Sequence, residues 1–431
     1  MKRLPAVLIL LLLPGTAAAQ ITDIGWTTSP LPYGRVLKHT SLRLDALQLS
    51  LPVEDEANYI GLDSWGDNPA GLTTNVRPAL KFLWGSSAYG PHPDLSRELS
   101  GLYFSHSSES VAIEVEGLRD AFLYSQPDES EDLSGSAAFG VKTDNLLFGA
   151  LWTGTSYENN YWSYNSKETS GRTLLGVGAI LNFSNSSLTL GLDGGMNKSR
   201  RLYADDSHFN LSGPEYGLQA ILKFEGGALG LKAHGGEMDD EIVYSYGRYK
   251  YDDSYRTGAV RFFKRFDSVP FNLGAEWEST RQINKTRYDY VYWPSSEDKT
   301  DFTYSVKAAG LAWRLEPGLL GFEARERLDD LDYYGTWTDS GRYRTFTTAF
   351  EYPVLRHVGI ILSYLRGTSS WTYTNSSNPS YNYSDSASLY SLGGGLTIKP
   401  SEALDLAASY KYIYTEGTIV NSLKLQTNFY F

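Results

Sequence analysis

Apolar and polar residues alternate along this chain in repeated segments of roughly ten residues. In one segment the apolar row holds Leu218, Ala220, Leu222 and Phe224, and Lys223 lies in the polar row. The same alternation recurs over residues 172–183, 188–193, 229–234, 271–278, 320–325 and 404–411. A period of two is typical of β-strands with one apolar face, so the pattern predicts an all-β chain.

Turn signals between the segments fall into two classes that alternate. Short turns are predicted near residues 142–144, 184–186, 225–227, 267–270, 316–318, 353–357 and 400–402. Long polar and aromatic loops are predicted over residues 157–170, 198–212, 238–254, 281–300, 329–340 and 368–385. Short periplasmic turns and longer outer loops are typical of membrane barrels. A soluble sandwich or propeller would not explain charged residues on one face of almost every strand.

We therefore predict a transmembrane antiparallel β-barrel over residues 76–431, with about 18 strands and a range of roughly 16 to 20. Both termini are expected in the periplasm. The terminal strand ends on Phe429 and Phe431 and resembles the last strand of bacterial outer-membrane proteins, which carries an assembly signal. The predicted partners are the barrel-assembly machinery, outer-membrane lipid and lipopolysaccharide.

The first residues predict export. Lys2 and Arg3 precede the apolar run 6–13, and the small residues 17–19 follow it, so residues 1–19 form a predicted signal peptide. The run is too short for a membrane-spanning helix. The predicted location is the cell outer membrane.

Composition excludes several function classes. The chain has 32 Tyr, 10 Trp and 41 Gly but no Cys, which removes disulfides, thiolate metal sites and a Cys nucleophile. Its formal net charge of −12 argues against a nucleic-acid partner.

Residues 20–75 fit the barrel pattern less well. Leu42 and Leu44 alternate with Arg43 and Asp45, but the phase slips immediately afterwards. The segment is either a first strand with a bulge or a periplasmic or plug-like segment, and we favour the latter.

Asn68, Pro69 and Ala70 lie just before the first well-patterned strand, in the sequence Gly-Asp-Asn-Pro-Ala-Gly-Leu. This element resembles the Asn-Pro-Ala-Gly element of the long-chain fatty-acid transporter family, whose N-terminal hatch plugs a barrel of similar chain length. The resemblance implies that these three residues lie where a hatch meets the barrel wall. An ordinary turn is the alternative interpretation.

Tyr-rich strands such as 244–251 and 288–293 give the chain a second resemblance, to the porin-like partners of multihaem cytochromes. This resemblance rests on size and composition and implies a sheath around an electron-transfer protein.

Charged residues in the polar rows are expected to line the lumen, because each would cost about 2–4 kcal/mol on the lipid face. The candidates are Glu114, Lys223, Lys232, Arg261, Arg265, Glu276, Glu323, Arg325, Asp405 and Lys411, with Glu116 and Lys424 in similar positions. They either select a solute or pair with one another, and their mixed signs favour pairing.

Chemistry beyond transport is not predicted. The six His residues show no metal-ligand spacing and no companion Ser or Asp in an active-site motif. Acidic loop runs match no calcium loop. We predict no enzymatic activity, cofactor or metal.

The function predicted from the sequence is passive passage of a solute through an outer-membrane channel, with a hydrophobic or amphipathic solute favoured by the Asn-Pro-Ala-Gly element. The alternative is a sheath that holds a multihaem c-type cytochrome for electron transfer. An adhesin or receptor that acts through the long loops is a third hypothesis.

Overall fold

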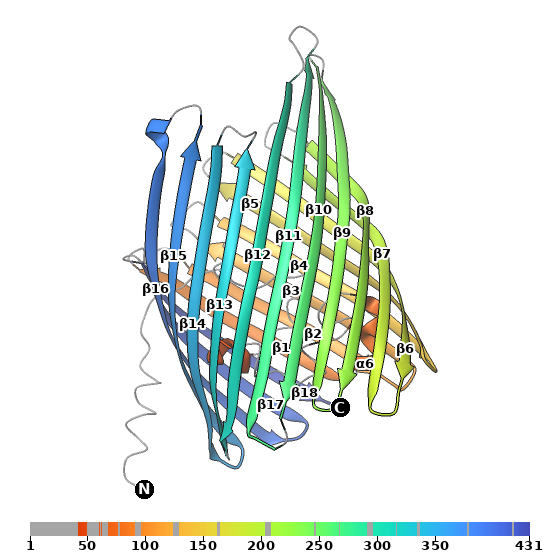
Figure 1. Cartoon of the computed structure of the whole chain (residues 1–431), viewed down its shortest axis with the longest axis vertical. Coiled ribbons are helices and arrows are strands. Elements are labelled where there is room, and N and C mark those ends of the chain that lie inside the picture. The colour runs from red at the N-terminus through yellow and green to blue at the C-terminus, as the bar shows by residue number, and fades with distance from the viewer. Residues whose placement is uncertain are drawn as a thin grey trace.

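The barrel closes through its first and last strands. The computed structural model describes residues 42–49, 60, 62, 68–75, 78–90, 96–123, 129–161, 164–202, 208–244, 247–266, 268–290, 296–315, 317–333, 337–376, 379–415 and 418–431. Every strand pairs antiparallel with its neighbours in sequence, and β1 also pairs with β18. The result is one closed sheet of 18 strands (Figure 1). The predicted fold class is confirmed, while the predicted signal peptide lies outside the described residues.

The strands are, in chain order, β1 (Ala79–Gly90), β2 (Ser96–Ser107), β3 (Val111–Leu123), β4 (Glu129–Thr143), β5 (Leu146–Tyr161), β6 (Tyr164–Asn182), β7 (Ser186–Leu202), β8 (His208–Phe224), β9 (Gly227–Tyr244), β10 (Gly247–Arg265), β11 (Phe271–Tyr290), β12 (Ser296–Leu315), β13 (Gly318–Tyr333), β14 (Trp337–Leu355), β15 (Val358–Asn375), β16 (Tyr383–Ser401), β17 (Leu404–Thr415) and β18 (Thr418–Tyr430). Short turns join alternate pairs at one end. Asp144 and Gly226 adopt left-handed φ values of 46° and 63° in two such turns.

Each strand has an apolar outward row and a polar inward row. On β3, Val115 is 47% exposed, whereas its neighbour Glu114 is fully buried. On β6, Leu175 is 65% exposed, whereas Leu174 is fully buried. A closed sheet satisfies its own backbone hydrogen bonds, and its exposed apolar rows form the outer surface. A protein that spans the hydrocarbon core of a membrane requires both properties.

The strands continue through most of the segments predicted as long loops. β9 and β10 pair without a register shift from Gly227 and Lys264 to Tyr244 and Gly247. β11 and β12 each have 20 residues, although roughly 9–11 residues span the membrane. The strands β9 to β12 rise above their neighbours (Figure 1).

The prediction of long loops is therefore wrong over these strands. Beyond the hydrocarbon layer a strand needs no apolar face, and cross-strand pairs of polar aromatic residues hold the sheet together. Tyr249 on β10 meets Tyr288 on β11 edge-on, with ring centroids 4.9 Å apart. On neighbouring strands Tyr343 meets Trp371 in the same way at 5.2 Å.

The C-terminal strand completes the seam with aromatic contacts on the outer face. Phe429 meets Phe82 of β1 edge-on at 6.4 Å, and Phe431 stacks on Phe104 of β2 at 6.1 Å. Their role as an assembly signal stays a prediction.

Two short helical pieces precede the barrel in sequence. They are α3 (Leu42–Leu47), and η1 (Pro69–Gly71) followed directly by α6 (Leu72–Asn75). The strand alternative for residues 42–47 is therefore wrong, because these residues form a helix that buries Leu42, Ala46 and Leu47. A further turn, η2 (Pro379–Tyr381), joins β15 to β16. Within the described ranges, the chain has no helix whose length and hydropathy would let it cross a membrane.

Candidate functional site: the lumen and the segment inside it

The predicted lumen residues lie on the inward rows of their strands. Glu114 is buried on the inward row of β3, whereas its sequence neighbours Ile113 and Val115 face outward. Lys223 shares the inward row of β8 with buried Ile221. The others on inward rows are Lys232, Arg261, Arg265, Glu276, Glu323, Arg325, Asp405 and Lys411. Their role in solute selection stays a prediction.

Several of these charges have a partner of opposite sign. Arg261 donates to Glu276 across β10 and β11 at 3.2 Å. Arg325 donates to Glu323 along β13 at 3.0 Å. Such pairs neutralise one another and leave a polar wall without a dominant sign, which agrees with the pairing interpretation.

A buried ionic cluster lies on the inward rows of β6 to β10. The Nε of Arg172 donates to the two carboxylate oxygens of Glu215 at 2.7 and 2.9 Å. The hydroxyl of Tyr255 also donates to Glu215, at 3.2 Å. The ring of His234 lies 3.6 Å from the same carboxylate and 4.0 Å from that of Asp193.

A second cluster lies on β11 to β14. Tyr304 donates to the buried carboxylate of Glu278 at 3.1 Å. The guanidinium of Arg327 lies over the ring of Tyr304 and donates to Asp329 at 2.6 Å. The inward wall therefore combines charge pairs with tyrosines over much of its circumference.

The helix α3 lies inside the barrel against β14 to β18. Asp45 accepts hydrogen bonds from Lys411 at 2.6 Å and from Lys424 at 3.2 Å, and a third from Ser409. The Nε of Arg43 donates to both carboxylate oxygens of Glu351 at 2.9 and 3.0 Å. Residues 42–49 and these contacts are called the α3 anchor.

Electrostatics favour the ionised form of Asp45. Burial alone would raise its pKa, but the ammonium groups of Lys411 and Lys424, together with hydrogen bonds from Lys411 and Ser409, lower the pKa well below the ordinary value of 3.8. Asp45 therefore keeps its negative charge at neutral and mildly acidic pH.

Neutral contacts complete the α3 anchor. Ser363 on β15 donates to the carbonyl of Ala46 at 2.6 Å and accepts from the Nε2 of Gln48 at 2.8 Å. Leu47 and Leu49 are buried in one cluster with Ala349 and Ile361 of the wall.

The Asn-Pro-Ala-Gly element forms the second contact with the wall. The side chain of Asn68 accepts from the backbone N–H of Ala70 at 3.0 Å, and Pro69 occupies the first helical position, where it needs no donor. Residues 68–75 pack against β3 to β6, and Asn68, Pro69 and Ala70 are buried. These residues and contacts are called the Asn68 anchor.

Glycines on the inward rows make room for the Asn68 anchor. A Cβ on Gly149 would lie 2.1 Å from the carbonyl oxygen of Pro69, and one on Gly176 would lie 2.1 Å from the Oδ1 of Asn68. Only glycine allows the segment to approach so closely at these positions. The three predicted hatch residues therefore lie against the wall, and their role as a hatch stays a prediction.

Apolar residues bury the remaining contacts near the short-turn end. Ile60, Leu62 and Ala70 form a cluster with Ile221 of β8 and Phe263 of β10. Leu72 forms another with residues of β3 to β6. The described pieces between residues 42 and 75, called the inner segment, thus contact the wall on several sides.

Metal binding finds no support in the described part of the chain. No group of three or more His, Asp or Glu side chains there is arranged to hold a metal ion.

The closed sheet, the apolar outer rows and the polar inner rows together define an integral membrane barrel of the outer-membrane type. The chain is an outer-membrane β-barrel, which confirms the predicted location.

Comparisons with solved structures find similar barrels. The siderophore receptor PirA from Acinetobacter baumannii has 7% identity and a TM-score of 0.46, with 82% of this chain and 81% of that chain covered. PirA from Pseudomonas aeruginosa has 10% identity and a TM-score of 0.44, with 82% and 80% covered. The ferric-catecholate import receptor Fiu from E. coli has 8% identity and a TM-score of 0.41, with 82% of each chain covered.

No family model and no curated protein sequence matches the chain. The resemblances to fatty-acid transporters and to cytochrome partners are therefore not confirmed. Similarity at this level does not indicate a solute.

Sequence reasoning placed Lys411 and Lys424 in the lumen but missed that they hold α3 through Asp45. Neither Glu351 nor the inward glycines stood out, because one carboxylate or one glycine in a polar row is common in any barrel. A helical reading of Leu42, Ala46, Leu47 and Leu49 was the available signal for α3.

Proposed function

We propose that this chain is an outer-membrane channel that its own inner segment closes near the periplasmic end, and that it passes a solute when this segment moves. The contact of Asp45 with Lys411 and Lys424 carries the proposal, since it ties a non-strand segment to the inside of the wall. A barrel of 18 strands has a lumen wide enough for water, so closure must come from inside.

The inward wall favours a polar solute. Arg172, Glu215, Arg261, Glu276 and Arg327 lie on inward rows, so a solute in the lumen meets charges and hydroxyl groups. We therefore propose a water-soluble solute in place of the hydrophobic one that the Asn-Pro-Ala-Gly resemblance implies. The paired charges favour weak ion selectivity.

The channel is also favoured over the cytochrome sheath. The α3 and Asn68 anchors occupy lumen surface on β14 to β18 and on β3 to β6. A docked partner would have to displace both anchors before it could line the same wall. We therefore propose that the chain supplies its own lumen occupant.

Osmotic swelling of liposomes tests the proposal. The mature chain and a variant lacking residues 20–75 are reconstituted at equal density, and swelling is followed in a small neutral sugar. We expect slow swelling with the mature chain and fast swelling with the deletion. Altered electrophoretic mobility on heating shows whether each barrel has assembled. Equally fast swelling with the mature chain, or none with an assembled deletion variant, would contradict the proposal.

A further inference from the structure

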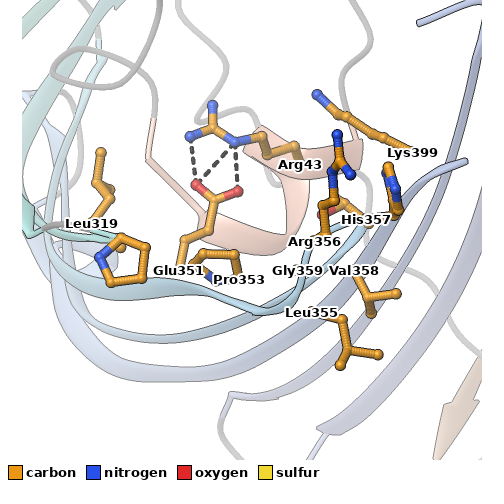
Figure 2. Close-up of a pocket in the computed structure, with 13 residues that line it drawn as sticks. Arg43, Leu319, Glu351, Pro353, Leu355, Arg356, His357, Val358, Gly359 and Lys399 are labelled. Carbon is orange, nitrogen blue, oxygen red and sulfur yellow. Dashed lines mark hydrogen bonds and ion pairs between the residues drawn. The ribbon is translucent and has the colours of Figure 1, made fainter. Parts of the chain in front are cut away.

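A cavity of about 360 Å³ opens beside the α3 anchor, at the short-turn end of the lumen (Figure 2). Its lining includes Leu319, Glu351, Gly359, Thr397 and Lys399, which all belong to inward rows. These residues place the cavity on the lumen side of the wall, and Leu355 and Val358, which flank the β14–β15 turn, also contribute to its lining. Its size lies within the range of known sites for small ligands.

Positive charge dominates this cavity. Among the described residues, Arg43, Arg356 and Lys399 bring positive side chains to the lining and His357 brings an imidazole, whereas Glu351 is the one carboxylate. Glu351 already accepts three hydrogen bonds from Arg43. Lys399 lies 4.0 Å from Asp405 and is 63% exposed, so this second pair is weak. With Arg356, the basic groups still form an excess of positive charge in a chain whose net charge is −12.

The backbone fixes the basic groups next to each other. Arg356 and His357 form the turn between β14 and β15. The N–H of Lys399 on β16 donates to the carbonyl of His357 at 2.8 Å, which ties this turn to the neighbouring strand. Figure 2 shows Arg356, His357 and Lys399 close together, while the guanidinium of Arg43 points toward Glu351.

We propose that this cavity binds a small periplasmic oxyanion with two or more negative charges, carried by phosphate or carboxylate groups. Arg356 offers the planar fork that suits such oxygens, and Lys399 adds a second charge. A bound oxyanion competes with Glu351 for Arg43, so it weakens one ionic contact of the α3 anchor. This regulatory step rests on the proposed function, whereas the binding site does not.

Calorimetric titration of the full chain in detergent with pyrophosphate tests the site. We expect saturable binding, and an affinity about tenfold or more lower in an R356Q/K399Q variant, since two charge-assisted contacts are lost.

A K250Q/K285Q variant removes the same charge at the far end of β10 and β11, where we expect unchanged affinity. Glu351→Gln frees Arg43 and should raise the affinity several-fold. No binding by the wild-type chain, or equal affinity in R356Q/K399Q, would overturn the site.

Competing vesicles identify the source of the anion. Phosphatidylcholine and phosphatidylglycerol vesicles are added in separate titrations at fixed pyrophosphate. If neither kind of vesicle displaces pyrophosphate, the proposal that the ligand is a soluble anion is supported. If only the phosphatidylglycerol vesicles displace it, that proposal is overturned. Calorimetry does not depend on a conducting channel. If the wild-type chain binds pyrophosphate and R356Q/K399Q does not, the site is supported whether or not the barrel opens. A channel that conducts but binds no pyrophosphate overturns the site and leaves the proposed function standing.

Discussion

The α3 anchor and the Asn68 anchor hold the inner segment by different physical means. At the α3 anchor, Asp45 and Arg43 reach charged partners on β14, β17 and β18. At the Asn68 anchor, Asn68 and Pro69 fit against the backbone of Gly149 and Gly176. One contact depends on charge and the other on shape.

This difference indicates which end of the inner segment can be released. An ionic contact responds to pH, to salt and to a competing anion, because each changes the electrostatic energy without altering the covalent structure. A glycine fit responds to none of these. We therefore expect α3 to leave the wall first, while the Asn68 anchor stays as a tether.

The largest effect is expected from Asp45→Asn. It leaves Lys411 and Lys424 without their shared carboxylate, and loss of one partner from a buried charge pair costs about 2–5 kcal/mol. Trypsin should then cut after Arg43 at least about tenfold faster, as followed by mass spectrometry of the folded barrel. Asp252→Asn, which removes an exposed carboxylate 3.3 Å from Lys250, is the matched control. Equal protection of Arg43 in both variants would contradict an ionic anchor.

Gly149→Val should have the next largest effect and should act on the other anchor. Its side chain would overlap the backbone of Pro69, and such overpacking costs about 1–3 kcal/mol. We expect greater hydrogen exchange at the N–H of Ala70, with Arg43 still protected from trypsin. Gly258→Val is the control, because a Cβ there meets nothing within 4 Å. If the N–H of Ala70 exchanges at the wild-type rate in both valine variants, the close fit at Gly149 does not anchor the segment.

Glu351→Gln should weaken the α3 anchor less than Asp45→Asn does. Arg43 and Glu351 are 33% and 18% exposed, so solvent screens their attraction, and we expect a loss of about 1 kcal/mol. Trypsin cleavage after Arg43 should rise about fivefold at low salt. The difference from wild type should shrink in high salt, where screening already weakens the pair. A salt-independent difference would show that packing, and not charge, dominates this contact.

Mild acid should have the smallest effect. The pKa of Asp45 is lowered on folding, so its ionic contribution is complete above its ordinary pKa of 3.8 and is lost only as the pH falls through the lowered value. Protection of Arg43 should therefore be unchanged between about pH 7.5 and pH 5 and decline below about pH 4. Protease digestion with an acid-stable enzyme extends the measurement to low pH. Loss of protection near pH 6 would point to a group other than Asp45.

The barrel wall could be predicted because lipid imposes a strict rule on every strand. Where a strand crosses hydrocarbon, outward apolar residues alternate with inward ones, as do Leu175, Val177 and Leu222. The number of strands therefore follows from counting the alternating segments. Above the membrane that rule no longer applies. The segments that hold Tyr249 and Tyr288 therefore fit a long loop as well as a Tyr-rich strand, and in the structure the two residues pair within the sheet.

The inner segment could be predicted only in part. The Asn-Pro-Ala-Gly element stood out because Asn, Pro and Gly together are rare outside special turns. The partners of Asp45 come from strands more than 360 residues away in sequence, as the separation of 366 residues to Lys411 illustrates. Pairing over such distances depends on barrel closure, which no local pattern records.

Single-channel conductance of the D45N/G149V double variant tests the central claim most directly, because it breaks the charge contact and the shape contact together. In the same planar bilayer, the wild-type chain should remain closed or open rarely, and the double variant should show large, stable openings. A fully assembled double variant that stays as silent as the wild type would contradict closure by the inner segment, as would a wild-type chain that already conducts as well as the double variant.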